Sequence, residues 1–159
     1  MDAARDLLVD LPDEAATAGL AALLAGRARR GDVIGLEGPL GSGKTTFARA
    51  FIRAYGGTEE EVPSPTFTLV EIYAFADKPP VWHFDLYRLS APEEAWELGI
   101  EEAWAEGISL IEWPERLGRL LPAEHLLLAL AEGRHPGARL ARLAASPAWE
   151  GRLGGIADG

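Results

Sequence analysis

A glycine-rich stretch that ends in lysine and threonine is the part of the sequence best suited to chemistry. Residues 38–46 read Gly-Pro-Leu-Gly-Ser-Gly-Lys-Thr-Thr. Gly38 and Gly43 enclose four residues and Lys44 follows, which is the G-x-x-x-x-G-K-[ST] spacing of a phosphate-binding loop. Glycines let the backbone wrap closely around phosphate oxygens, and the amides at the start of the following helix face the anion. In this pattern Lys44 would reach the β- and γ-phosphates, and the hydroxyl of Thr45 would ligate Mg²⁺.

The residues on either side of this loop support the same interpretation. Residues 32–37 form a short apolar segment, as expected of a core strand. After the loop, apolar residues recur at helical spacing, at Phe47, Ala50, Phe51 and Ala54. A strand, a glycine loop and a helix in that order are the setting that a phosphate-binding loop requires. The alternative is a plain glycine-rich turn before a helix.

Two acidic side chains stand at the ends of apolar segments further along the chain. Asp85 closes residues 81–85, the layout of a Walker B acid, and Glu112 lies near the end of residues 108–113. Because ligands of open α/β sheets gather at the carboxyl ends of strands, we expect Lys44, Asp85 and Glu112 to converge on one catalytic site. Carboxylates there can join the Mg²⁺ shell of a phosphoryl-transfer site. The alternative for Asp85 is to cap the next turn.

A further candidate segment, residues 62–68, reads Val-Pro-Ser-Pro-Thr-Phe-Thr. Two prolines one residue apart stiffen this backbone and exclude a helix. A rigid segment shortly after a phosphate-loop helix is where nucleotide-sensing loops lie in related architectures. Ser64 or Thr66 is therefore a candidate to offer a hydroxyl to Mg²⁺ or to the γ-phosphate. The alternative is that both are turn residues beside proline.

The patterning as a whole predicts an α/β fold. We expect a single three-layer domain like that of P-loop NTPases, with a mixed, mostly parallel central sheet flanked by helices. The expected strands are residues 6–11 at a sheet edge, 32–37, 68–74, 81–85, 108–113, 124–131 and 139–144, with an antiparallel hairpin formed by 68–74 and 81–85. Helices are expected to begin near residues 12, 44, 92, 101 and 114.

Several side chains outside the glycine loop also receive an expected role. Trp96 and Leu98 are expected to pack inward from the helix that begins near residue 92. His83 shares a strand face with Asp85 and is interpreted as a strand histidine with satisfied hydrogen bonds.

Residues 1–145 are assigned to the ATPase-like domain and 146–159 to a weakly specified C-terminal tail, which Trp149 would pin in part.

Composition narrows the class of protein. The chain has 159 residues, enough for one domain with a real core, and it has no cysteine, so disulfides and thiolate metal sites are excluded. No apolar run is long enough to span a membrane, and the N-terminal residues lack a signal-peptide layout, so a cytoplasmic location is expected. The net charge of −10 argues against strong direct binding of nucleic acid. The acidity either serves solubility or forms a face that docks on a basic protein partner.

Four stretches of the sequence together resemble the TsaE (YjeE) family of small bacterial P-loop ATPases. They are residues 38–46, 62–70, 83–89 (His-Phe-Asp-Leu-Tyr-Arg-Leu) and 111–116 (Ile-Glu-Trp-Pro-Glu-Arg). The phosphate loop alone does not identify a family, whereas the second and third stretches are far more specific to this one. The resemblance implies a role in forming N6-threonylcarbamoyladenosine at position 37 of tRNAs that read codons starting with A. It also implies binding and hydrolysis of ATP in association with the TsaB–TsaD heterodimer, with tRNA contacted mainly through these partners.

The resemblance also assigns roles to individual residues. It implies that Thr45 and Glu112 are Mg²⁺ ligands, with Asp85 as a Walker-B-like acid. Ser64 and Thr66 would lie in the switch-like loop. Gly133-Arg134 is similar to a weaker C-terminal signature of the family, which makes Arg134 a candidate nucleotide contact. The phosphates would be held by Gly38, Gly41, Ser42, Gly43, Lys44, Thr45 and Thr46.

Two other classes of function use the same kind of loop. A small-molecule kinase would need an acceptor pocket and a lid, commonly arginine-rich, and no arginine cluster lies in a suitable position. An assembly switch would bind nucleotide without useful hydrolysis. Because no arginine finger is assignable, slow, partner-dependent hydrolysis is expected. The sequence also lacks a guanine-reading Asn-Lys-x-Asp motif, which favours adenine.

Overall fold

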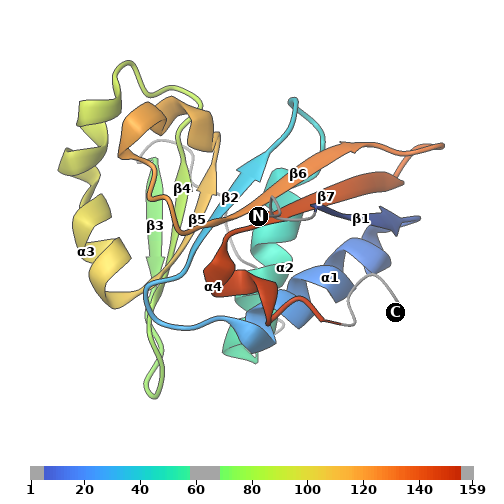
Figure 1. Ribbon diagram of the computed structural model, residues 1–159, viewed down its shortest axis with the longest axis horizontal. Helices are drawn as coiled ribbons and strands as arrows, with labels where there is room; N and C mark the ends of the chain where they lie inside the picture. Colours follow the sequence, from blue (N-terminus) through green and yellow to red (C-terminus); the bar gives the residue numbers. More distant parts are fainter. Residues whose placement is uncertain (1–5, 58–68, 155–159) are drawn as a thin grey trace.

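The protein folds around one mixed β-sheet, shown in a computed structural model that describes residues 6–57 and 69–154 (Figure 1). Within these ranges the sheet has seven strands in the order β1-β7-β6-β2-β5-β4-β3. Their bounds are β1 Asp6–Leu11, β2 Val33–Glu37, β3 Val70–Tyr73, β4 Val81–Asp85, β5 Ile108–Glu112, β6 Leu126–Glu132 and β7 Arg139–Ala145. The predicted α/β class and the expected strands are therefore confirmed.

The parallel part of the sheet is its centre. Strands β6, β2, β5 and β4 run parallel to one another, whereas β1–β7, β6–β7 and β3–β4 are antiparallel. The predicted hairpin of β3 and β4 and the edge position of β1 are both confirmed. Because β2, β4 and β5 point the same way, their carboxyl ends meet at one edge of the sheet, which is where ligands of such sheets bind.

Helices cover both faces of the sheet, as the three-layer prediction requires. The elements are α1 Glu14–Arg27 and α2 Lys44–Gly56 on one face; the 3₁₀-helices η1 Pro92–Leu98 and η2 Pro114–Leu120 with α3 Ile100–Glu106 on the other; and α4 Pro147–Glu150 near the end of the chain. Among the described residues, no helix combines the length and the apolar character needed to cross a membrane.

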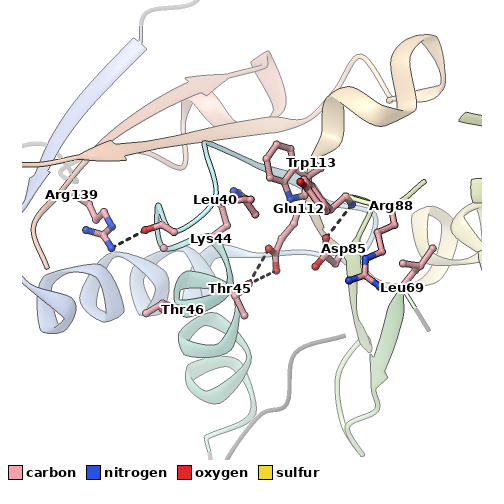
Figure 2. Close-up of a pocket in the computed structure, with 13 residues that line it drawn as sticks. Leu40, Lys44, Thr45, Thr46, Leu69, Asp85, Arg88, Glu112, Trp113 and Arg139 are labelled. Carbon is pink, nitrogen blue, oxygen red and sulfur yellow. Dashed lines mark hydrogen bonds between the residues drawn. The ribbon is translucent and has the colours of Figure 1, made fainter. Parts of the chain in front are cut away.

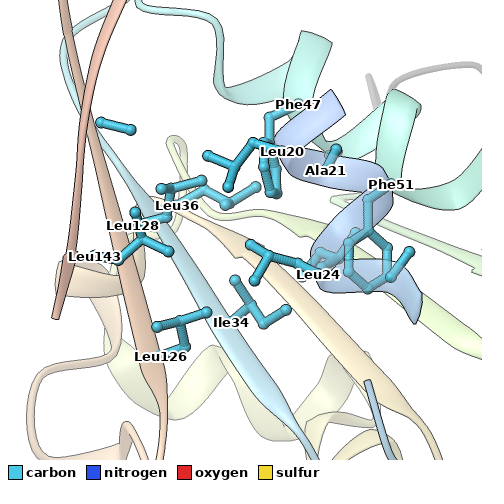
Figure 3. Close-up of a cluster of buried hydrophobic side chains, with 14 of the residues drawn as sticks. Leu20, Ala21, Leu24, Ile34, Leu36, Phe47, Phe51, Leu126, Leu128 and Leu143 are labelled. Carbon is cyan, nitrogen blue, oxygen red and sulfur yellow. The ribbon is translucent and has the colours of Figure 1, made fainter. Parts of the chain in front are cut away.

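The larger hydrophobic cluster fixes the phosphate-loop helix against the sheet. Alternate residues of β2, Ile34 and Leu36, point toward α1 and α2 and are fully buried. They pack with Leu24 of α1 and with Phe47 and Phe51 of α2, as Figure 3 shows. The helix that follows the loop is thus held by a continuous apolar stripe, and this stripe sets where the loop itself lies.

The packing of η1 differs from the expectation. Trp96 is 41% exposed, so the prediction that it packs inward is wrong, whereas Leu98 does pack against the second core cluster. The segment is a 3₁₀-helix with three residues per turn, so Ala95 and Leu98 share a face. Ala95 is fully buried, and Trp96 points to the outside beside Trp104.

The residues after β7 pack against the domain up to Gly154. Trp149 is 1% exposed, and the guanidinium of Arg152 lies 3.8 Å from its ring. Arg152 also donates two hydrogen bonds to the carboxylate of Asp32, at 2.7 and 2.9 Å. Trp149 therefore pins part of the segment after β7, as expected, and Arg152 joins this segment to the start of β2.

We predict that Trp149→Ala lowers the free energy of unfolding by about 3–5 kcal/mol, because it empties a fully buried aromatic site. Trp96→Ala is the matched control: its ring is largely exposed, so a loss of about 1 kcal/mol or less is expected. Urea denaturation followed by far-UV circular dichroism measures both. Equal losses in the two variants would contradict the packing described here.

Candidate functional site

The loop between β2 and α2 has a backbone that two of its glycines make possible. Gly38 has φ +146°, and a Cβ there would lie 2.5 Å from the carbonyl oxygen of Leu130 and 2.6 Å from Oγ of Ser42. Gly43 has φ +102° and is the N-terminal cap of α2, with no side-chain hydrogen bond to cap the helix. The first amides of a helix have no intrahelical acceptor. The start of α2 therefore offers uncapped N–H groups and the positive end of the helix dipole to an anion.

Lys44 is buried beside this loop and contacts it directly. Its Nζ donates to the carbonyl oxygens of Gly38 (2.5 Å) and Pro39 (2.9 Å), and it lies 4.2 Å from the ring centre of Trp113. Burial lowers the pKa of Lys44 from its ordinary value, and the nearby carboxylates, Glu112 foremost, oppose this change. Lys44 thus places a cation at the loop, in a position that carboxylates help to keep charged.

The two predicted acids meet at the carboxyl end of the sheet. Asp85 and Glu112 are direct neighbours in the parallel register of β4 and β5. Thr45 donates its hydroxyl hydrogen to the Glu112 carboxylate, with Oγ1 at 3.0 and 3.1 Å from the two oxygens. Burial raises the pKa of the Asp85 carboxyl, the Tyr87 amide that donates to Oδ1 (3.1 Å) opposes the rise, and Glu112 adds to it. The structure therefore brings Lys44, Thr45, Asp85 and Glu112 together, as the spacing predicted.

His83 joins this group from within the sheet. Its side chain is fully buried, and Nε2 lies 2.7 Å from Oε2 of Glu112. An ionised carboxylate only accepts hydrogen bonds, so Nε2 carries the hydrogen and donates it. Nδ1 is buried and has no hydrogen-bond partner in the described part of the chain. His83 is thus satisfied on one nitrogen only, and it holds one oxygen of Glu112 in place.

These groups line a cavity of about 600 Å³ at the edge of the sheet, shown in Figure 2. The predicted site residues that line it are Gly41, Gly43, Lys44, Thr45, Thr46, Asp85 and Glu112. Gly38 and Ser42 belong to the same loop but face the protein, and Ser42 is 1% exposed with no hydrogen-bond partner for Oγ among the described residues. The cavity therefore combines the phosphate-loop backbone, the lysine Lys44, the threonines Thr45 and Thr46, and the carboxylates of Asp85 and Glu112.

Three other predicted contacts are not among the residues that line this cavity in the described part of the chain. Ser64 and Thr66 fall in residues 58–68, outside the described residues. Arg134 is exposed and lines a different cavity of about 550 Å³, together with Asp10 and His135. The structure does not bring Arg134 to the cavity at the phosphate loop, whereas Arg139 lines both cavities.

Several lining residues were not among the predicted ones: Leu40, Leu69, Tyr87, Arg88, Trp113 and Arg139. Trp113 directly follows Glu112, and Tyr87 and Arg88 lie two and three residues after Asp85. Their position just after a strand end could have pointed to them. Leu69 and Trp113 have φ of +64° and +63°, which is uncommon for bulky residues. Such conformations tend to occur at functional sites, but no sequence pattern predicts them.

The donor set suits a magnesium–phosphate complex. Mg²⁺ prefers oxygen ligands and is usually bound through one or two side chains together with phosphate oxygens and water. Thr45, Asp85 and Glu112 supply a hydroxyl and two carboxylates next to the loop amides. In the described ranges no three or more His, Cys, Asp or Glu side chains form a group able to hold a metal alone.

The fold and the site together define an α/β domain of the P-loop NTPase type. The crystal structure of Bacillus subtilis YdiB has the same architecture, with a TM-score of 0.78 over 96% of this chain and 95% of that chain at 28% sequence identity. The family model described as threonylcarbamoyl adenosine biosynthesis protein TsaE matches residues 11–140. The chain belongs to the TsaE family, so the resemblance seen in its motifs is confirmed.

Curated relatives support this membership. A tRNA threonylcarbamoyladenosine biosynthesis protein TsaE from Rickettsia conorii is 44% identical over 111 residues, which cover 70% of this chain and 63% of that protein. A protein of the same name from Bacillus subtilis is 39% identical over 120 residues, covering 75% of this chain and 72% of the relative. The match thus spans less than two thirds of the length of the Rickettsia conorii protein.

We predict that His83→Leu lowers the free energy of unfolding by about 1–3 kcal/mol, because it removes a donor from the buried Glu112 carboxylate. His83→Gln keeps an N–H at a similar distance from the backbone and should recover most of this loss. Urea denaturation of both variants measures the difference. If the glutamine variant were as unstable as the leucine variant, the hydrogen bond would not be what His83 contributes.

Proposed function

We propose that this protein binds ATP with Mg²⁺ and hydrolyses it as an accessory factor in the N6-threonylcarbamoyl modification of adenosine 37 in tRNAs reading codons that start with A. It would act with the TsaB–TsaD heterodimer. The observation that carries the proposal is the meeting of the uncapped α2 amides, Lys44, Thr45 and two strand-end carboxylates at one cavity. Membership of the TsaE family supports the pathway.

Each group at the cavity would have a distinct role in hydrolysis. The loop amides and Lys44 would hold the phosphates and stabilise the charge that develops on the transferred group. The Thr45 hydroxyl and a carboxylate would hold Mg²⁺, which supplies charge neutralisation at the β- and γ-phosphates. Asp85 or Glu112 would orient the attacking water. Glu112 is the more firmly oriented of the two, since Thr45 and His83 both donate to it.

The contacts of the loop and the net charge of the chain both support a hydrolysis rate that depends on partners. Lys44 and Thr45 both donate to groups of the protein itself, so they must exchange these contacts to serve a triphosphate and its metal. A partner that favours this exchange would accelerate turnover. The net charge of −10 is unsuited to tRNA, so the RNA contact would belong mainly to the partners.

Two alternatives use the same cavity. A nucleotide-dependent assembly switch would hold TsaB–TsaD in the presence of ATP and Mg²⁺ yet release no phosphate faster with partners than without them. A small-molecule kinase would transfer the γ-phosphate to an acceptor, which a screen for phosphorylated products would reveal. A pull-down with both partners, with and without ATP and Mg²⁺, tests the partner binding that the ATPase and the assembly switch both require.

We predict that Lys44→Ala weakens the binding of Mg²⁺–ATP about 30-fold or more, since a charge-assisted contact to phosphate is worth about 2 kcal/mol. Isothermal titration calorimetry measures the affinity. The chain has one other lysine, Lys78, which donates to the Tyr55 carbonyl away from the cavity, so Lys78→Ala is the matched control. Equal affinities for the two variants would argue against nucleotide binding at this loop.

We predict that Glu112→Ala abolishes phosphate release in the presence of TsaB–TsaD, because it removes a candidate metal ligand and water-orienting group. Glu112→Gln preserves the shape of the side chain and should be equally inactive if the charge is what matters. Thermal unfolding of both variants checks that the domain is intact. Turnover that matches the unmodified protein would remove Glu112 from the mechanism.

A further inference from the structure

One arginine from a distant strand holds the backbone of the phosphate loop. Arg139 donates from Nε to the carbonyl oxygen of Ser42 (2.7 Å) and from Nη2 to that of Gly41 (3.1 Å). A Cβ on Gly43 would lie 3.2 Å from Nε of Arg139, so glycine there also leaves room for the guanidinium. In Figure 2 Arg139 approaches the loop from the side opposite Glu112 and Asp85. Arg139 therefore contacts the loop at Gly41 and Ser42, on the side away from the two predicted acids.

These two hydrogen bonds fix the direction of two peptide planes. A trans peptide points its C=O and N–H in opposite directions. Holding the Gly41 carbonyl directs the Ser42 N–H away from Arg139, and this N–H donates to the Pro39 carbonyl at 3.1 Å. Holding the Ser42 carbonyl directs the Gly43 N–H away from Arg139 in the same manner. The arginine thus orients loop amides without having to touch a ligand itself.

The fold places Arg139 here through the β6–β7 hairpin. Strand β6 runs parallel beside β2, so it reaches the point where β2 enters the loop. The hairpin then turns back tightly, with the Gly133 N–H donating to the Ala138 carbonyl at 2.9 Å. A Cβ on Gly133 would lie 2.7 Å from Cβ of Ala138 and 2.9 Å from the Arg139 nitrogen. Arg139, the first residue of β7, is thereby held next to the loop.

We propose that Arg139 is a positioning residue for nucleotide binding, which sets the phosphate-loop amides by holding the carbonyls of Gly41 and Ser42. The proposal rests on the proposed function, because it assigns the loop to a nucleotide. The planar fork of arginine has donors for two carbonyls at once, whereas lysine offers a single point charge. Positive charge alone is therefore insufficient, and Arg139→Lys should lose the effect.

The choice of nucleotide separates positioning from direct contact. Loop amides cradle the α- and β-phosphates, which ADP and ATP share. A residue that positions these amides affects the binding of both nucleotides equally. A residue that touches the γ-phosphate affects ATP only. The comparison of ADP with ATP thus distinguishes the proposed role from that of a catalytic arginine.

The test uses the full chain with Arg139→Lys and Arg139→Gln, and Arg142→Lys and Arg142→Gln as matched controls. Arg142 lies on the same strand, is about as exposed as its partner Asp6, and pairs with it at 2.9 Å away from the loop. Calorimetry measures the affinities for Mg²⁺–ADP and Mg²⁺–ATP. Hydrogen–deuterium exchange of residues 41–43, recorded without nucleotide, measures how firmly the loop is held.

Both Arg139 variants should bind ADP and ATP about tenfold more weakly, as expected when hydrogen bonds from a charged group are lost. Their residues 41–43 should exchange faster, and the Arg142 variants should match the unmodified protein in both measurements. Unchanged exchange and affinity in Arg139→Lys, a loss confined to ATP, or an equal loss in the Arg142 variants would each overturn the proposal. If the unmodified protein bound no nucleotide, the proposed function would be wrong, and unchanged exchange at residues 41–43 would then overturn the positioning role separately.

Discussion

The site depends on how the backbone polar groups of one short loop are satisfied. Its carbonyls are taken by cations of the protein: those of Gly38 and Pro39 by Lys44, and those of Gly41 and Ser42 by Arg139. Its amides at the start of α2 receive no side-chain cap. Backbone polar groups need partners, and four loop carbonyls find theirs within the protein, while the first amides of α2 have no side-chain acceptor. The proposed binding of phosphate would thus depend on the loop backbone as well as on Lys44.

The opposite wall of the cavity depends on a buried carboxylate. Glu112 is 2% exposed, and burying an ionised group is costly unless hydrogen bonds and charges compensate for it. Thr45 from α2 and His83 from β4 supply the hydrogen bonds, while Lys44 adds opposite charge nearby. The helix that follows the loop and the centre of the sheet are therefore connected through one side chain, which keeps the acid at a fixed distance from the loop.

The sequence predicted those site residues that short-range patterns along the chain can identify. Glycine spacing located the loop, and acids at the ends of apolar segments located Asp85 and Glu112. Local patterns could not identify Arg139 as a site residue, because its position beside the loop depends on the pairing of β6 with β2. The periodicity of a single segment does not predict which strands pair. Trp96 was misplaced because the segment is a 3₁₀-helix in which Ala95 and Leu98 share the buried face, and local sequence did not indicate which residues that face would hold. The packing of Arg152 on Asp32 joins residues 120 positions apart, so no local pattern could indicate it.

That same pair has a consequence for how the protein is made. Asp32 stands just before β2 and accepts from the Arg29 amide as well as from Arg152, so one carboxylate joins the start of the central strand to the segment that follows α4. During synthesis this junction cannot close until Arg152 has been made, 120 positions after Asp32. Contacts so distant along the chain slow folding. A polypeptide that ended before Arg152 would therefore lack this contact at the start of its central strand.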